Sequence, residues 1–196
     1  MKMMSLAAAS ALALAGPLHA TELVTNGSFE TGNFGGWTEF GVSNQSFITD
    51  DLLGGGPTDG TRHAAFGPVA EEGGIQQLLE TVPGQTYRLS FDIANLGGGI
   101  NFFTAEWNGA LFSFGFAQAG FDYLTSAGFV VATGNTSLLN FRFRHAESLW
   151  LLDNVSVTST AVIPEPASWA LLILGFGVIG IAMRRQSRHP SNVGAG

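Results

Sequence analysis

The sequence of 196 residues contains no cysteine. Disulfide bonds are therefore excluded, as are zinc and iron–sulfur sites built on thiolates. The catalytic motifs His-Glu-x-x-His and Gly-x-Ser-x-Gly are missing too. His145-Ala146-Glu147 has the His-x-Glu spacing of zinc deaminases, but the cysteine ligands of those enzymes do not exist here. We therefore predict no catalytic residue.

Basic residues are scarce in the middle of the chain. Between Thr21 and Thr160 the sequence has four arginines and fourteen acidic residues, which gives a net charge near −10. Such a surface argues against nucleic acid and anionic lipid as partners, because both are themselves negative. It is better suited to divalent cations or neutral sugars.

The N-terminal twenty residues are typical of a secretory signal peptide. A weakly positive start at Lys2 precedes an apolar block over 6–15, which is too short to span a membrane. Pro17 breaks the block, and Ala20 supplies a small residue for cleavage. We expect the mature protein to begin at Thr21.

The C-terminus combines a proline-rich acidic segment, an apolar run and a basic end. Pro164-Glu165-Pro166 closes a linker over 161–166, and residues 167–183 carry no charge. As a helix this run is about 26 Å long, at the short end of what crosses a bilayer core. Arg184 and Arg185 mark the cytoplasmic side. We predict a transmembrane helix over 167–183 and a basic tail over 184–196.

This tail resembles the PEP-CTERM sorting signal of Gram-negative bacteria. The resemblance implies that an exosortase, a membrane protease, cuts near Pro164-Glu165-Pro166, so that the helix is a transient membrane anchor. It also implies an exported protein held in the inner membrane before processing, and then located at the cell surface or in the extracellular matrix. An ordinary single-span anchor is the alternative.

Residues 21–160 show strand periodicity and no convincing helical periodicity. Tyr87, Leu89, Phe91 and Ile93 alternate with polar residues, and Ser137–Arg144 repeats this pattern. Asn108-Gly109 predicts a hairpin. Further strands are expected at 37–40, 45–49, 63–66, 74–82, 101–107, 110–114, 128–133 and 150–158. Such short strands with glycine-rich breaks predict an all-β, antiparallel β-sandwich with jelly-roll connections.

The two ends of this domain resemble galactose-binding-like carbohydrate-binding modules. Leu23 to Glu30 with Gly35-Gly36-Trp37 is similar to their opening, Pro83 to Phe91 to their middle, and Leu151 to Val157 to their closing strand. The resemblance implies a structural calcium held by Glu30 and Asp153.

The alternation supports a special role for Asp153. It falls in phase with Leu151, Val155 and Val157, so it is expected to point inwards, where a carboxylate needs a partner. Calcium is one such partner. The alternatives are a capped bend, or an ion pair with Arg142 or Arg144.

Trp107 and Trp150 are candidates for rings exposed to a sugar ligand, although the 16 phenylalanines indicate an aromatic core in which most rings pack. We predict an exported, non-enzymatic surface or exopolysaccharide-matrix protein with a carbohydrate-binding sandwich. One alternative is a glycan hydrolase that uses a carboxylate pair. Another is a structural matrix component without a ligand.

Overall fold

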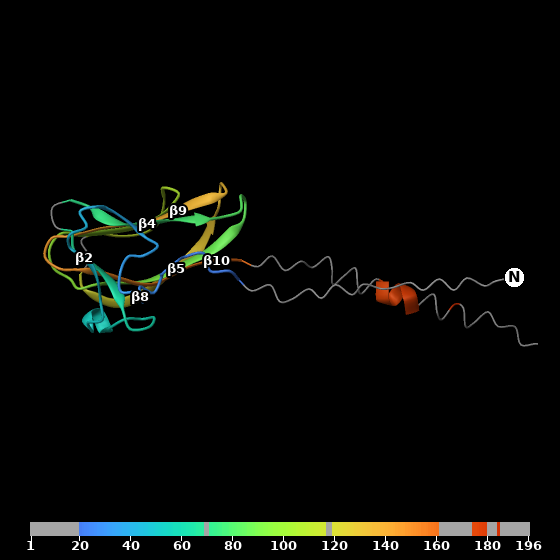
Figure 1. Cartoon of the computed structure of the whole chain (residues 1–196), viewed down its shortest axis with the longest axis horizontal. Coiled ribbons are helices and arrows are strands. Elements are labelled where there is room, and N and C mark those ends of the chain that lie inside the picture. The colour runs from blue at the N-terminus through green and yellow to red at the C-terminus, as the bar shows by residue number, and fades with distance from the viewer. Residues whose placement is uncertain (1–19, 69–70, 117–118, 161–173, 180–183, 185–196) are drawn as a thin grey trace, which may run out of the picture. The chain divides into compact units, whose positions relative to one another are not determined.

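The structure, a computed structural model, describes residues 20–68, 71–116, 119–160, 174–179 and 184 (Figure 1). The chain divides into two units, of which His19–Thr160 is one. Of the predicted membrane helix, only residues 174–179 are described, and they are helical. Among the residues that the structure describes, no helix is long and apolar enough to cross a membrane.

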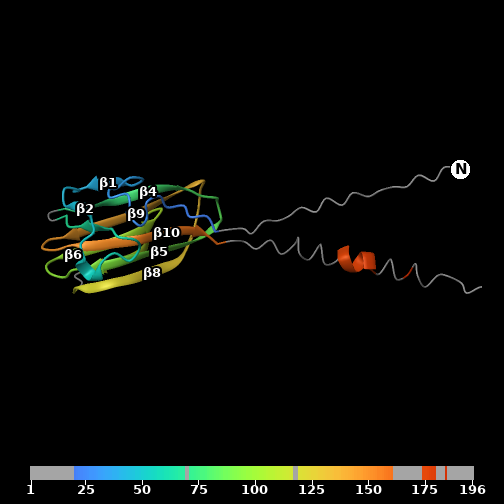
Figure 2. The same cartoon turned by 60° about the horizontal axis from the view of Figure 1, so that its bottom comes forward.

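The domain consists of two antiparallel five-stranded sheets, which confirms the predicted β-sandwich (Figures 1 and 2). In spatial order, the first sheet contains β1 (Thr38–Gly41), β4 (Gly73–Glu80), β9 (Thr136–His145), β6 (Asn101–Trp107) and β7 (Ala110–Phe116). The second sheet contains β2 (Ser46–Thr49), β3 (His63–Phe66), β10 (Trp150–Ser159), β5 (Thr86–Asn95) and β8 (Phe121–Val131). Every strand pair is antiparallel.

The core lies between the sheets and is rich in phenylalanine. Alternate residues of β5 and β9, among them Phe91, Phe141 and Phe143, are fully buried. The rings of Phe66 and Phe143 stack with centroids 4.1 Å apart, so the two sheets interlock through aromatic contacts. Burying each such side chain stabilises the fold by about 2–3 kcal/mol, which explains how the domain holds together without disulfides.

The connection between β2 and β3 covers the outer face of the second sheet. It contains the short 3-10 helix η1 (Leu53–Gly55), and Leu53 packs against Ala65, Ala94 and Leu151. At Gly54, where φ is +59°, a Cβ atom would lie 2.8 Å from the Leu151 side chain, so glycine permits the close approach. The second sheet is therefore buried on both faces along this connection.

A β-bulge in β10 changes which side chains face the core. Asn154 has a φ of +50°, and the pairing with β5 shifts between Asp153 and Ser156. Val155 therefore joins the main core, whereas Asp153 lies opposite Asp92 on the outer face of the second sheet. The prediction that Asp153 and Val155 point to the same face of the sheet was wrong, because the bulge between them interrupts the alternation of side chains.

Candidate functional site

The outer face of the first sheet carries a row of side chains with an aromatic residue at each end. Phe40, Gly74, Arg142, Thr104 and Phe114 are register partners, one from each of the five strands. Arg142 and Thr104 stand between core residues of their strands, so alternation directs the middle of this row outwards, and Phe114 is largely exposed. We call this surface the polar face. Its other members are Glu72, Gln76, Phe102, Glu106, Phe116, Asn140 and Arg144.

Arg142 organises the charges of the polar face. Its guanidinium forms an ion pair with Glu72 and lies 3.7 Å from the Glu106 carboxylate. Asn140 donates a hydrogen bond of 3.2 Å to Glu106, and the Thr104 hydroxyl donates one of 3.4 Å. Strands β6 and β9, together with Glu72 just before β4, thus hold a connected set of donors and acceptors in the middle of the sheet.

Exposed aromatic rings border these polar groups. Phe114 is 70% exposed and Phe116 is 63% exposed, both on the edge strand β7. On the opposite side, Phe40 lies over Gly74, where a Cβ atom would be only 2.9 Å from the ring. Glycine at position 74 therefore gives the Phe40 ring its place beside the polar groups.

The two tryptophans chosen from the sequence do not form an exposed site. Trp107 is 5% exposed and Trp150 is 1% exposed, so neither offers a ring face to a ligand. Trp107 donates a hydrogen bond of 3.0 Å from Nε1 to the Val131 carbonyl. Leu151 points to the outer face of the second sheet. Because side chains alternate along a strand, the neighbouring Trp150 points into the core between the sheets. The prediction that either ring is exposed to a ligand was therefore wrong.

Glu30 and Asp153 both bind the segment that leads from η1 to β3. Asp153 accepts hydrogen bonds from the backbone N–H of Thr58 at 2.7 Å and of Asp59 at 3.0 Å. Glu30 accepts from the backbone N–H of Thr61 and of Arg62, both at 2.7 Å. Neither carboxylate pairs with Arg142, because Arg142 binds Glu72 on the other sheet.

The surroundings shift the pKa values of the Asp153 and Glu30 carboxyl groups in opposite directions. Burial raises the pKa of Asp153, although the N–H groups of Asp59, Thr58 and Asn154 oppose this shift. Hydrogen bonding from the Thr61 backbone holds the pKa of Glu30 below its ordinary value.

Calcium at Glu30 and Asp153 would compete with hydrogen bonds that the two carboxylates already accept. Calcium needs oxygen ligands directed at the ion, whereas here N–H groups are directed at the carboxylate oxygens of Glu30 and Asp153. Among the described residues, no cluster of three or more acidic or histidine side chains has the geometry to hold a metal. Calcium at Glu30 and Asp153 stays a prediction, and hydrogen bonds supply the role it was expected to fill.

A second polar cluster lies beneath the β2–β3 connection. The Tyr123 hydroxyl is 2.9 Å from His63 Nδ1. Burial, followed by the charges of Asp153 and Asp92, raises the pKa of Tyr123, so its hydroxyl keeps the proton and shares a hydrogen bond with His63. Asp92 accepts from Thr125 at 2.5 Å and from Asn154 at 3.0 Å. Asp92 and Asp153 are both buried, and both already accept hydrogen bonds from neighbouring groups. They therefore do not form an accessible catalytic pair.

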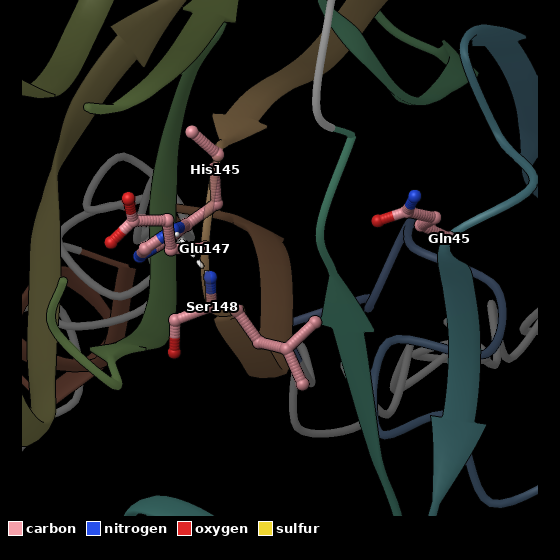
Figure 3. A pocket seen from close by; sticks show the side chains of 6 residues that line it. Gln45, His145, Glu147 and Ser148 are labelled. Carbon is pink, nitrogen blue, oxygen red and sulfur yellow. Dashed lines mark hydrogen bonds between the residues drawn. The ribbon is translucent and has the colours of Figure 1, made fainter. Parts of the chain in front are cut away.

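A cavity of about 430 Å³ lies beyond the end of β9 (Figure 3). His145, Glu147 and Ser148 line one side of it, and Gln45 faces them from another part of the chain. His145 Nδ1 accepts a hydrogen bond of 3.0 Å from the Ser148 N–H, and its Nε2 lies 3.4 Å from Asn95 Oδ1. Both ring nitrogens are thus engaged within the protein, which makes His145 a structural residue.

The residues predicted for sorting lie mostly outside the described part of the chain. This applies to Pro164, Glu165, Pro166 and Arg185, whereas Arg184 is described and helical. Ala20, the predicted cleavage residue, is described and exposed.

The comparisons with known proteins agree with two features of the sequence. The PEP-CTERM protein-sorting motif matches residues 162–186, so the chain carries this motif, which indicates an exported protein sorted to the cell surface. Among curated proteins, no sequence matches the chain.

Carbohydrate-binding modules are among the solved structures that share this sandwich. A xylan-binding domain of module family 22 is 14% identical with a TM-score of 0.51, over 77% of this chain and 99% of its own. The module TmCBM61, solved with β-1,4-galactotriose, is 14% identical with a TM-score of 0.50, over 70% and 97%. The active domain of tailspike protein 4 from bacteriophage CBA120 is 15% identical with a TM-score of 0.54, but the chain covers only 21% of it. At these identities the likeness establishes the fold alone.

Proposed function

We propose that the domain over residues 21–160 is a jelly-roll module that binds a polysaccharide on its polar face. The observation that carries this proposal is the row from Phe40 through Arg142 to Phe114. A sugar ring has an apolar C–H surface and a rim of hydroxyls, so its binding site needs flat apolar rings beside paired donors and acceptors. The exposed Phe114 ring and the Arg142–Glu106 pair offer both on one surface.

The charge distribution favours a neutral glycan. The net charge near −10 repels an acidic polymer at long range, and the carboxylates of Glu72 and Glu106 already neutralise Arg142. Carboxylates and amides accept and donate hydrogen bonds to hydroxyls without requiring charge on the ligand. The xylan and galactotriose named for the two similar modules are therefore suitable first probes.

We propose that the module binds its glycan without cutting it. A glycosidase needs one carboxyl group that holds a proton beside the bond to be cut. On the polar face, Glu72 and Glu106 both face the Arg142 guanidinium, and each is used as an acceptor. The pair Asp92 and Asp153 is buried under the β2–β3 connection. A carboxylate-pair hydrolase remains the second candidate function, and product release distinguishes it.

The sorting motif supports a proposal for where the protein acts. We propose that an exosortase processes the exported chain near Pro164-Glu165-Pro166, after the helix over 167–183 has held it in the inner membrane. The released protein then acts at the cell surface or in the exopolysaccharide matrix.

The direct test is affinity electrophoresis of the full chain, in detergent, through gels that contain xylan, β-1,4-galactan or no polysaccharide. The proposal expects slower migration in at least one polysaccharide gel and no new reducing ends in a parallel incubation. Slower migration with reducing ends would support the hydrolase instead. Unchanged migration across a full panel of neutral glycans would leave a structural matrix component without a ligand.

A further inference from the structure

Arg144, on β9, is the one arginine of the described domain that has no partner within the protein. The other three are each held by neighbouring side chains: Arg62 by the charge of Glu30, Arg88 by the Ser90 hydroxyl, and Arg142 by Glu72 and Glu106. Within the described part of the chain, the Arg144 guanidinium forms no hydrogen bond and no ion pair. Fourteen acidic residues are available in the domain, yet none of them is used for this cation.

The Arg144 side chain lies against the polar face and keeps its terminal groups open. It follows Arg142 by two residues on β9, so both side chains point to the same side of the first sheet. Its Nε atom is closed off from solvent and has no hydrogen-bond partner, whereas the two Nη groups are not buried. The stem is therefore held against the sheet, and only the end of the guanidinium fork faces outwards. A side chain held in this way loses little further freedom when it binds a ligand.

Phenylalanines lie beside Arg144 on the same face. Its register partner on β6 is Phe102, whose own partner on β7 is Phe116. Phe116 is 63% exposed. This row runs beside the row of Arg142 and Phe114, about 7 Å further along the strands. The polar face thus twice combines an arginine of β9 with an exposed ring of β7, but only Arg142 is neutralised by carboxylates.

The polar face is electrically balanced within an acidic domain. Its members include two arginines, Arg142 and Arg144, and two acids, Glu72 and Glu106, so their formal charges cancel. Both carboxylates face Arg142, which leaves the local positive charge at Arg144. The other acidic residues act from a distance, where salt screens them over about 8 Å at physiological ionic strength. The domain therefore repels a chain made of acidic units but can accept a single acidic group in contact with Arg144.

A carboxylate matches the open end of Arg144. Guanidinium groups bind carboxylates through two parallel N–H···O hydrogen bonds, and the two Nη groups supply both donors. An acidic sugar carries its carboxylate beside a ring whose C–H surface can pack on the Phe116 ring. We propose that Arg144 binds the carboxylate of a uronic acid unit that an otherwise neutral polysaccharide carries on the polar face. This inference rests on the proposed glycan binding and narrows the class of its ligand.

Matched oligosaccharides test the proposal by isothermal titration of the full chain in detergent. The probes are β-1,4-xylotetraose, the same oligosaccharide with one glucuronic acid branch, and the methyl ester of the branched compound. Charge-assisted hydrogen bonds at a partly exposed site should make the acid bind roughly tenfold more tightly than xylotetraose. The methyl ester should lose this gain, because it keeps the additional sugar ring but removes the charge.

Arg144→Gln provides the test of the residue itself. We expect the ratio of the Kd values for the neutral and the acidic oligosaccharide to fall from roughly ten in the wild type to about one. Arg88→Gln, at an exposed position of the second sheet, is the matched control and should keep the full ratio. A melting temperature equal to that of the wild type shows that each variant is folded. In the wild type, the ratio should also decrease from 0.1 M to 1 M salt, because the screening length shortens from about 10 Å to about 3 Å.

The failure of this inference and the failure of glycan binding give different results. Equal Kd values for the acid and xylotetraose in the wild type would overturn the role of Arg144 and leave glycan binding intact. A preference for the acid that survives in folded Arg144→Gln would do the same. Absence of binding to all three oligosaccharides would contradict the glycan site itself, and the inference with it.

Discussion

The Oδ2 atom of Asp153 accepts a hydrogen bond of 2.7 Å from the backbone N–H of Thr58, which precedes it by 95 residues. The Thr58 hydroxyl and the Asp59 N–H bind the same oxygen at 3.1 and 3.0 Å. The last strand of the sandwich thereby fixes the connection that covers the second sheet.

Replacing this carboxylate is expected to destabilise the domain. Asp153→Ala leaves the N–H groups of Thr58, Asp59 and Asn154 without their acceptor, which should lower the free energy of unfolding by about 1–3 kcal/mol. Asp51→Ala, in the same connection but exposed, is the control and should change it by less than about 0.5 kcal/mol. Thermal unfolding of both variants measures the difference. Equal melting temperatures would mean that Asp153 does not hold the connection.

Calcium is expected to have no effect on stability. An ion at Glu30 and Asp153 would have to displace the N–H groups of Thr58 and Thr61 from the carboxylate oxygens. The melting temperature should therefore be the same in millimolar calcium and in chelator. A saturating ion would instead stabilise the folded state by about 2.7 kcal/mol at a hundredfold excess over its Kd. Such a rise, reversed by chelator and lost in Asp153→Asn, would establish the calcium site predicted from the sequence.

Mild acid is expected to destabilise the domain through two histidines. Burial lowers the pKa of His63 and of His145, with Asp51 and Glu147 opposing it only in part. The folded state thus binds a proton less readily than the unfolded state, whose histidines titrate near pH 6.5. Above that pH the histidines cause no loss of stability. As the pH decreases below it, the free energy of unfolding falls by at most about 1.4 kcal/mol per pH unit for each histidine. Unfolding between pH 7.5 and 5.5 should show this slope in the wild type and a smaller one in His63→Gln and His145→Gln. Parallel curves for all three proteins would contradict the assignment.

Sorting is expected to depend on the acidic proline box. Changing Pro164, Glu165 and Pro166 to alanine removes the motif residues but keeps the apolar run and Arg184-Arg185. The variant should accumulate in the inner membrane with its full tail, whereas the wild type loses the tail. Intact mass spectrometry of membrane and extracellular fractions distinguishes the two forms. A variant processed like the wild type would show that the box is not what the protease reads.

Much of the fold was predictable because alternation is a local property. The stretch from Tyr87 to Ile93 and the one from Leu139 to Phe143 both form strands that bury the expected side chains. The Asn108-Gly109 hairpin is confirmed, and both residues have positive φ, as a tight turn of this kind requires.

The polar face was not predicted, because its members are far apart in the sequence. Glu72 and Arg142 meet only through the pairing of β4 with β9, and Phe114 joins them from the edge strand β7. Trp150 was misassigned for a related reason. Alternation separates the two faces of a strand, but it does not say which face a distant segment covers, and here η1 covers the face of Leu151.

The most direct test of the polar face compares two phenylalanines. Phe114, on the polar face, and Phe129, on β8 of the other sheet, are each 70% exposed. Isothermal titration with a soluble xylan or galactan oligosaccharide measures binding to a single site. Phe114→Ala should weaken binding at least tenfold, the loss of about 1.4 kcal/mol expected for a central aromatic contact, whereas Phe129→Ala should leave the Kd unchanged. Equal affinities for the wild type and both variants would contradict a glycan site on the polar face.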